Sequence, residues 1–355
     1  MKKTKWIWAA VIFVLLTVLL LGGAQALLVP HDKAANPDAF LLADYFEADT
    51  TYDEVIFLGD CEVYEAFSPV VLWEKYGITS RVCGTPQQLM WHSYAILEQV
   101  LKRSDPKVVV LGVYGLIYSE PQNEAYNRMV FDHLPASMTK WQVLGDAMVK
   151  DEPWELNESL ASYLLPLLRY HDRWSELTWR DVTTLFDKQE PVSVRGYLVQ
   201  TDVVPGEAPG HEGALPPYAN AVSGMALDYF ERIVSLCHEK DIELVLVKAP
   251  TDSWRYPWHE EYEQKVRALA AQYDLPYYNF LNDFDTIGLD FSTDTYDAGL
   301  HLNVYGAEKL TAYFGAILKE NYELTDGRLW EHLGAAWAED IARYEAQKEK
   351  GRGEP

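Results

Sequence analysis

The sequence predicts an α/β fold in which a parallel sheet of about five strands carries helices on both faces. Short apolar or β-branched runs alternate with helical segments along much of the chain, which is typical of such sheets. Of the 355 residues, 48% are apolar, so a large core can form. This length fits one α/β domain with insertions, or two domains at most.

The predicted strands come in two groups, separated by a long interval. Within each group, helical segments with apolar positions at helical spacing alternate with the strands, and Asp105-Pro106 ends one of these segments. The strands are Glu54–Gly59, Ser80–Gly84, Lys107–Val113, Ile242–Pro250 and Leu275–Phe280. The helical segments are 68–77, Gln87–Ser104, Leu227–His238, Glu260–Gln272 and Tyr305–Lys319.

The interval 114–218 breaks the alternation, and we interpret it as a cap insertion within a domain that spans 51–325. It contains three helical segments and then a Gly/Pro-rich stretch. The helical segments are Pro135–Lys150, Leu156–Tyr170 and Trp174–Phe186. Residues 31–50 are expected to be a linker, and 326–355 a C-terminal helix and tail that end in a solvated ARYEAQKEKGRGEP.

Residues 1–30 predict a membrane anchor. Lys2, Lys3 and Lys5 precede an uncharged run that is about as long as the roughly 20 residues needed to cross a bilayer. The lysines orient the rest of the chain outside the cytoplasm. The small residues of AQA leave cleavage after Ala26, and hence secretion, as an alternative. Because the apolar run continues through LLVP, we favour a single-pass anchor at the cell membrane.

The exported part is strongly acidic. All 54 Asp and Glu residues follow residue 30, whereas three of the 30 Lys and Arg residues precede it, so its formal charge is 27 − 54 = −27. Such a surface repels nucleic acid and anionic lipid. We therefore expect no nucleic-acid partner, and a long polyanion is a poor substrate unless a local basic patch or a cation intervenes.

Three cysteines, Cys61, Cys83 and Cys237, are too few for a disulfide scaffold. Cys237 lies on the apolar side of a predicted helix, where core packing accounts for it. No metal-binding motif is present, so we expect no metal and no cofactor.

A set of reactive side chains is predicted at the carboxyl edge of the sheet. Cys61 follows the first strand and Gly84 the second, while His301 precedes the last helix with Asp297 four residues earlier. A thiol needs a base to take its proton, and the base needs a carboxylate that orients it. An oxyanion needs fixed N–H donors, to which a glycine allows close approach.

These motifs resemble those of the SGNH (GDSL-like) hydrolase superfamily. FLGDCEV is similar to its first motif, with Cys61 at the serine position, CGTPQQ to its glycine motif, and DAGLHLN to its final Asp/His motif. Across Thr51–Thr325 the resemblance implies a flavodoxin-like three-layer sandwich. It also implies a triad of Cys61, His301 and Asp297, with the backbone N–H groups of Cys61 and Gly84 as oxyanion donors.

The anchor, the insertion and the motif order look closest to extracytoplasmic members of this superfamily. These include the teichoic-acid D-alanylation protein and the alginate-type O-acetyltransferases, which work beside membrane-bound O-acyltransferases. The resemblance therefore implies an acyl esterase or O-acyltransferase that acts on an acylated glycan of the cell envelope. A membrane-bound O-acyltransferase is the implied protein partner.

Two further departures from the family pattern affect the site. Three residues rather than two separate Asp297 from His301, which leaves Asp294 as the alternative acid. The segment GVYGLIYSE lacks the asparagine expected after the third strand, and Asn123 or Asn127 from the insertion is a candidate replacement. A larger set of side chains is predicted to line the site, with local capping or ion pairing as the alternative: Asp60, Asn123, Asn127 and Arg128.

Three interpretations of Cys61 stay open. It is a nucleophile that forms a thioester, an inert replacement for serine, or one half of a disulfide with Cys83. The inert form predicts a second function, that of a non-catalytic glycan- or acyl-binding accessory subunit of a membrane-bound O-acyltransferase.

Overall fold

The computed structural model of the chain describes residues 2–48, 52–148, 158–206, 222–251 and 259–353. The chain forms two compact units. One contains Pro37–Val149 and Val192–Pro355, and the other contains Met1–Asn36 and Lys150–Pro191.

The larger unit is built on a five-stranded parallel sheet, as the sequence predicts. The strand order is β2-β1-β3-β4-β5, the flavodoxin-like order, and every neighbouring pair is parallel. The strands are β1 (Val55–Gly59), β2 (Ser80–Gly84), β3 (Val108–Gly112), β4 (Glu243–Lys248) and β5 (Tyr277–Asn279). β1, β2 and β3 are buried throughout, and β1 and β3 are accordingly apolar without alternation. β2 contains the buried Arg81, which pairs with Asp53 at 3.0 Å.

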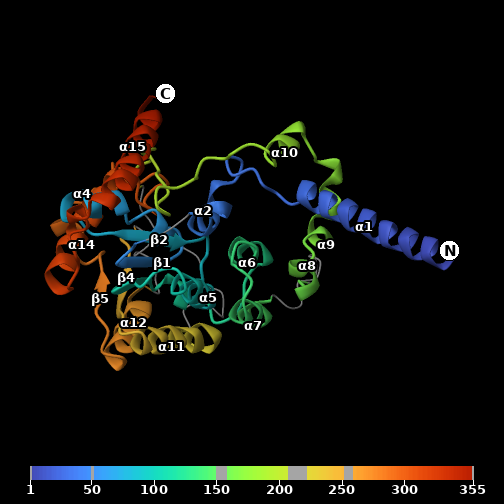
Figure 1. The fold of residues 1–355 in the computed structure, drawn as a ribbon. Coiled ribbons are helices and arrows are strands. Elements are labelled where there is room, and N and C mark those ends of the chain that lie inside the picture. The colour runs from blue at the N-terminus through green and yellow to red at the C-terminus, as the bar shows by residue number, and fades with distance from the viewer. Residues whose placement is uncertain (1, 49–51, 149–157, 207–221, 252–258, 354–355) are drawn as a thin grey trace. The chain divides into compact units, whose positions relative to one another are not determined.

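Helices cover both faces of this sheet (Figure 1). α4 (Pro69–Tyr76) packs against α14 (Val304–Asn321), and α5 (Met90–Val100) packs against α11 (Gly224–Glu239). On the α14 side, Phe57 and Phe314 belong to one buried cluster with residues of all the longer strands. The remaining helices of this unit are α2 (Leu41–Glu47), α3 (Cys61–Tyr64), α6 (Glu124–Phe131), α7 (Met138–Ala147), α12 (His259–Gln272), α13 (Phe284–Ile287) and α15 (Glu331–Gly353).

The short helix α3 sits directly on the ends of the strands because glycines leave room for it. A Cβ atom added at Gly59 would lie 2.4 Å from Val63 Cγ2, and one at Gly112 would lie 2.6 Å from the same atom. Real Cβ atoms do not approach so closely. The glycines that end β1 and β3 therefore allow Val63 to fill the space above them.

The C-terminal helix α15 is less solvated than the sequence predicts. Tyr344, within the segment ARYEAQ, is 1% exposed, and Trp337 is equally buried. Trp337 stacks on Trp73 of α4, with 4.6 Å between the ring centroids. The guanidinium of Arg195 also lies over the Trp337 ring, 3.7 Å from its centroid. The apolar residues that fix α15 are spaced too widely to stand out against its many charges.

The smaller unit contains the apolar helix α1 (Lys2–Leu28) and a set of short helices. Within Lys5–Leu28 of α1, an 18-residue stretch has a mean hydropathy of 2.6, and the segment is long enough to cross a membrane, although a signal sequence has the same properties. The short helices are α8 (Leu160–Leu164), α9 (Leu167–Tyr170), η3 (His171–Ser175) and α10 (Trp179–Thr183).

We expect Gly112→Ala to destabilise the protein, because the new methyl group would collide with Val63 and displace α3. Overpacking of this kind costs about 1–3 kcal/mol of unfolding free energy. Gly145→Ala in α7 is the matched control, since nothing lies within 4 Å of its Cβ position. There alanine should stabilise the helix by about 0.5–1 kcal/mol. Urea unfolding in detergent measures both, and equal effects would contradict the close packing of Val63.

Candidate active site

The candidate site lies at the carboxyl ends of β1 and β3, where the strand order reverses direction. Ligands of open α/β sheets bind at such switch points. β1 ends at Gly59, Asp60 caps α3, and Cys61 is the first residue of that helix. Asp297 and His301 lie in the loop that leads into α14. The sheet topology thus brings the segment that contains Cys61 next to the loop that contains Asp297 and His301, as the sequence predicts.

Cys61, His301 and Asp297 form a continuous chain of contacts. Cys61 Sγ lies 3.0 Å from His301 Nε2, and His301 Nδ1 lies 2.6 Å from Asp297 Oδ2. The backbone N–H of His301 also donates to Asp297 Oδ1 at 2.7 Å. The carboxylate thus fixes both the ring and the backbone of His301, and the ring nitrogen that faces the thiol is positioned for proton transfer.

The loop between Asp297 and His301 absorbs the extra residue that the family pattern lacks. Thr295 and Leu302 close the loop as an antiparallel bridge, and Ala298 (φ 63°) and Gly299 (φ 95°) make the turn. Asp294 instead accepts from Lys309 at 2.6 Å and from the backbone N–H of Asp290. The described contacts of Asp294 therefore stabilise the start of this loop. Asp297, not Asp294, is the acid that contacts the His301 ring.

Glu65 and Tyr296 contact His301 from a second side, and the sequence did not single them out. Glu65 Oε2 lies 3.9 Å from His301 Nδ1 and is 3% exposed as a residue. The Tyr296 hydroxyl donates to the Glu65 carboxylate at 3.0 Å, and its ring lies nearly parallel to the imidazole, 21° between planes. Glu65 follows Cys61 by four residues, so the sequence could have placed both on one face of a helix. Nothing in the sequence, however, indicates that this glutamate is buried.

A buried ion pair lies on the other side of Cys61. Lys248, the last residue of β4, donates to both carboxylate oxygens of Glu62 at 2.7 and 2.8 Å. Similarly, Arg128 pairs with Glu124 at 2.8 Å. Both basic residues therefore form structural ion pairs, which for Arg128 is the alternative that the sequence left open.

The thiol and the imidazole hold their protons strongly. Burial, and then the Asp60 carboxyl, raises the pKa of Cys61 to about 12, although the hydrogen bond with His301 acts in the opposite direction. Burial alone would lower the pKa of His301, but its hydrogen bond to Asp297 and its contacts with Cys61 and Glu65 raise that pKa to about 12. Burial thus favours the neutral form of the thiol, whereas Asp297 and Glu65 favour the charged form of the imidazole.

Two neighbouring carboxyl groups titrate near neutrality. Burial, and then the charge of Glu62, raises the pKa of Asp60 to about 7. Burial also raises the pKa of Glu65 to about 7, against the lowering effect of His301 and of the Tyr296 hydroxyl. Asp60 is thus close enough to influence the thiol, and its charge depends on pH in the physiological range.

The predicted oxyanion donors come from α3 and β2. Cys61 is the first residue of α3, where helix N–H groups have no acceptor within the helix. Gly84 ends β2 and pairs in register with Gly59. A Cβ atom at Gly84 would lie 2.8 Å from Tyr64 Cβ, so packing of α3 also accounts for this glycine.

The three predicted lining residues of the insertion have local partners in α5 to α7. Asn123 caps α6 by accepting from Ala125 N. Asn127 faces His92 Nε2 at 2.8 Å and donates to the carbonyl of Ala147. Among the bonds that the structure describes for Asn123, Asn127 and Arg128, none reaches Cys61 or His301.

Tyr114 is a further residue that the sequence did not single out. It directly follows β3, opens η2 (Tyr114–Leu116) and is partly exposed. Burial raises its pKa, and Glu62, Asp60 and Cys61 contribute to the same shift. Its phenol therefore keeps its proton in the electrostatic surroundings of Cys61.

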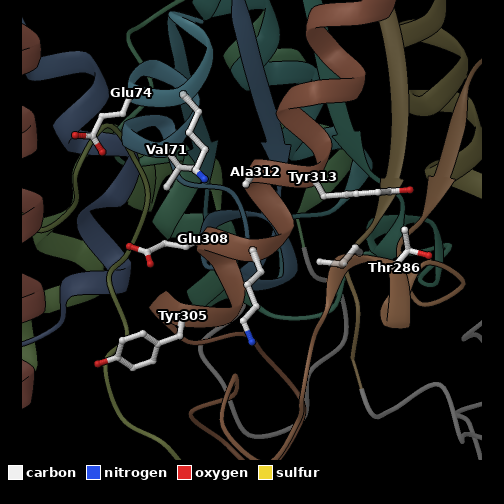
Figure 2. Close-up of a pocket in the computed structure, with 10 residues that line it drawn as sticks. Val71, Glu74, Thr286, Tyr305, Glu308, Ala312 and Tyr313 are labelled. Atoms are coloured by element: carbon white, nitrogen blue, oxygen red, sulfur yellow. The ribbon is translucent and has the colours of Figure 1, made fainter.

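The cavity at Cys61 is narrow, and a wider groove lies elsewhere. Cys61, Glu62 and His301 line a crevice with about 170 Å³ of empty space and no room for a water molecule. A groove of about 670 Å³ lies between α4, α13 and α14, with Tyr305, Glu308 and Tyr313 along α14 (Figure 2). The groove is lined by none of Cys61, His301 and Asp297.

The three cysteines are unpaired, so the structure does not form the Cys61–Cys83 disulfide. Cys83 and Cys237 are buried, whereas Cys61 is partly exposed.

Among the described residues, no group of His, Cys, Asp and Glu has the arrangement of a metal site.

Comparisons with known proteins give no family assignment, since no family model and no curated protein matches the chain. Two solved structures that it resembles are a "putative acylhydrolase" from Bacteroides fragilis and a GDSL-like lipase from Bacteroides thetaiotaomicron. Each has 10% sequence identity and aligns over 81% of this chain, with 97% and 99% of the other chain covered. The TM-scores, 0.36 and 0.34, are too low for an argument about activity.

Alkylation of Cys61 should depend steeply on pH. Because its pKa is raised, the thiolate fraction is small at neutral pH and the rate with iodoacetamide should rise throughout pH 7–10. Asp60→Asn removes a negative charge, which should lower the thiol pKa and accelerate alkylation several-fold above pH 7, where Asp60 is ionised. Peptide mass spectrometry measures the rate. Asp290→Asn, an exposed change in the His301-bearing loop region, is the control; an equal effect there would contradict this role of Asp60.

Glu65→Gln should lower the pKa of His301, because the Glu65 carboxylate favours the charged imidazole. The effect should be smaller than that of Asp297→Asn, since Asp297 contacts the ring at 2.6 Å and Glu65 at 3.9 Å. Histidine side-chain NMR over a pH titration gives both values. An unchanged His301 titration in Glu65→Gln would show that the carboxylate does not act on the ring.

Proposed function

We propose that this chain is an SGNH-like thiol enzyme, anchored in the membrane, that removes or transfers acyl groups of a cell-envelope glycan. The observation that supports this most strongly is the unbroken Cys61–His301–Asp297 chain at the carboxyl edge of the sheet. Its motifs resemble those of a superfamily that acts on esters. The N-terminal apolar helix supports an extracytoplasmic location.

In the proposed reaction, Cys61 Sγ attacks the acyl carbonyl carbon of the ester. In the form of the site that reacts, the imidazole is neutral, and its Nε2 takes the Cys61 proton as Sγ bonds to the carbonyl carbon. The carbonyl π electrons move onto oxygen to give a tetrahedral oxyanion. When this collapses, the C–O bond breaks and protonated His301 gives a proton to the departing alkoxide. Asp297 keeps the imidazole oriented and stabilises its charge.

A thioester on Cys61 is the resulting intermediate. A second nucleophile, water or a hydroxyl group, then attacks the thioester carbonyl while His301 takes its proton, and the thiol leaves with a proton from the ring. The product is a free acid or a new ester. Both outcomes use the same residues, so the proposal covers an esterase and an O-acyltransferase.

The oxyanion needs donors aimed at the carbonyl oxygen. The backbone N–H groups of Cys61 and Gly84 are the proposed pair. Tyr114 is the proposed third donor in place of the missing asparagine, because it follows β3 and keeps its phenolic proton under the electrostatic influence of Asp60 and Cys61.

A second candidate function is that of an accessory subunit that binds an acyl group or glycan without turning it over. The raised thiol pKa favours this alternative over a nucleophilic Cys61. In that case a membrane-bound O-acyltransferase would carry out the chemistry, and Cys61 would remain unmodified.

Exposure to an activated acyl ester should add one acyl group to the wild-type protein and none to Cys61→Ala, because only Sγ can form the thioester. His301→Ala and Asp297→Asn should each slow acylation by roughly 10²–10⁴-fold. Intact-mass spectrometry over time, followed by peptide mapping, measures adduct formation and its turnover.

Asp294→Asn is the matched control for Asp297→Asn, since both carboxylates lie in one loop and Asp294 contacts Lys309 rather than His301. Its acylation rate, corrected for folded protein, should stay near the wild-type rate. An adduct on Cys61→Ala, or no adduct on the wild type, would reject the enzyme and leave the accessory subunit.

A further inference from the structure

We propose that residues 160–187 form a membrane-interface platform, in which α8, α9, η3 and α10 rest in the outer headgroup layer beside the end of α1. This inference rests on the anchoring part of the proposed function and not on the chemistry of Cys61. The occupant of the exposed apolar surface is lipid, and specifically a zwitterionic lipid surface.

The platform exposes an unusual amount of apolar surface. Outside α1, the described residues include twelve large apolar side chains that are exposed, and seven of these lie in residues 160–186. Trp174, Trp179 and Phe186 are 73%, 77% and 83% exposed. Trp and Phe on short surface helices, together with Leu164 and Leu168, are the side chains that bind at the boundary between headgroups and acyl chains.

The platform is attached to one end of α1. Residues 5–16 of α1 are exposed throughout, and burial is concentrated in the last turns, with Leu28 fully covered. Arg173 donates to the carbonyl of Leu28, and Arg180 pairs with Asp32, with one N–O distance of 2.9 Å. α9, η3 and α10 all pack against α1 (Figure 1).

The length of α1 places this attachment at the membrane boundary. The run from Trp6 to Gly23 contains 18 residues, which is about 27 Å at 1.5 Å per residue. The hydrocarbon core of a bilayer is about 30 Å thick. If Lys5 lies at the inner interface, the segment that contacts the platform therefore begins where the outer interface begins.

The charges of the platform indicate insertion rather than electrostatic attraction. Its two central arginines are engaged within the unit, Arg173 with Asp181 at 2.9 Å and Arg180 with Asp32. The exported part of the chain is also strongly acidic, so an anionic lipid surface would repel it. Binding should thus depend on the aromatic and leucine side chains and require no anionic lipid.

The test uses the full-length protein in phosphatidylcholine nanodiscs that contain a phosphatidylcholine with a diazirine in its acyl chain near the headgroup. After photolysis, peptide mapping should find lipid adducts on α1 and on the platform peptides that contain Trp174, Trp179 and Phe186. Combining Trp174→Ser, Trp179→Ser and Phe186→Ser should reduce the platform adducts by about fivefold or more and leave those on α1 unchanged.

Met138→Ser combined with Leu329→Ser is the matched control, since these residues are 84% and 78% exposed in the larger unit. This variant should change no lipid adduct. In the wild-type protein, hydroxyl-radical oxidation from the water phase should modify Leu329 readily and Trp174 and Trp179 weakly.

Three outcomes would overturn the platform. The first is lipid adducts on α1 alone with full oxidation of the platform, which would place it in water. The second is protection from oxidation without lipid adducts, which would mean that protein covers it. The third is platform adducts that persist in the triple variant. A missing adduct on α1 would instead reject the anchor, and none of these results depends on the activity of Cys61.

Discussion

The packing of α3 onto the strand ends is the constraint on which the rest of the site depends. Val63 occupies the space that Gly59 and Gly112 leave open, and Tyr64 fills the space beside Gly84. This one turn of helix then directs three side chains into different surroundings. Cys61 faces His301, Glu62 pairs with Lys248, and Glu65 reaches the Tyr296 hydroxyl.

The site contains many carboxyl groups and few cations, and this determines its chemistry. Lys248 neutralises Glu62, whereas Asp60, Glu65 and Asp297 share the neighbourhood of one imidazole. A thiolate there would add a further negative charge to a buried region, which explains the raised pKa of Cys61. Asp297 and Glu65 favour a charged imidazole, so the thiol and the ring respond to the same group of carboxylates.

The departures from the family pattern have different structural consequences. The extra residue between Asp297 and His301 is accommodated by a turn at Ala298, so the acid still reaches the ring. The absence of the third-motif asparagine is not compensated by Asn123 or Asn127 in the described contacts, because one caps α6 and the other joins α5 to α7. Tyr114 is the residue that opens η2 after β3, and its role as a replacement is part of the proposed function.

The sequence by itself determined the strands, their parallel pairing and the meeting of Cys61, Asp297 and His301, because buried β-branched runs and the residues that follow them are local features. It could not determine that Tyr344 of the charged C-terminal helix is buried, or that Glu65 and Tyr296 contact His301, because a polar residue is buried only when a distant segment supplies its partner. The protonation of the thiol, the unpaired state of Cys83 and the attachment of Arg173 to the end of α1 were likewise decided by tertiary structure. Each depends on burial and distance between segments far apart in the chain, which no local pattern of residues records.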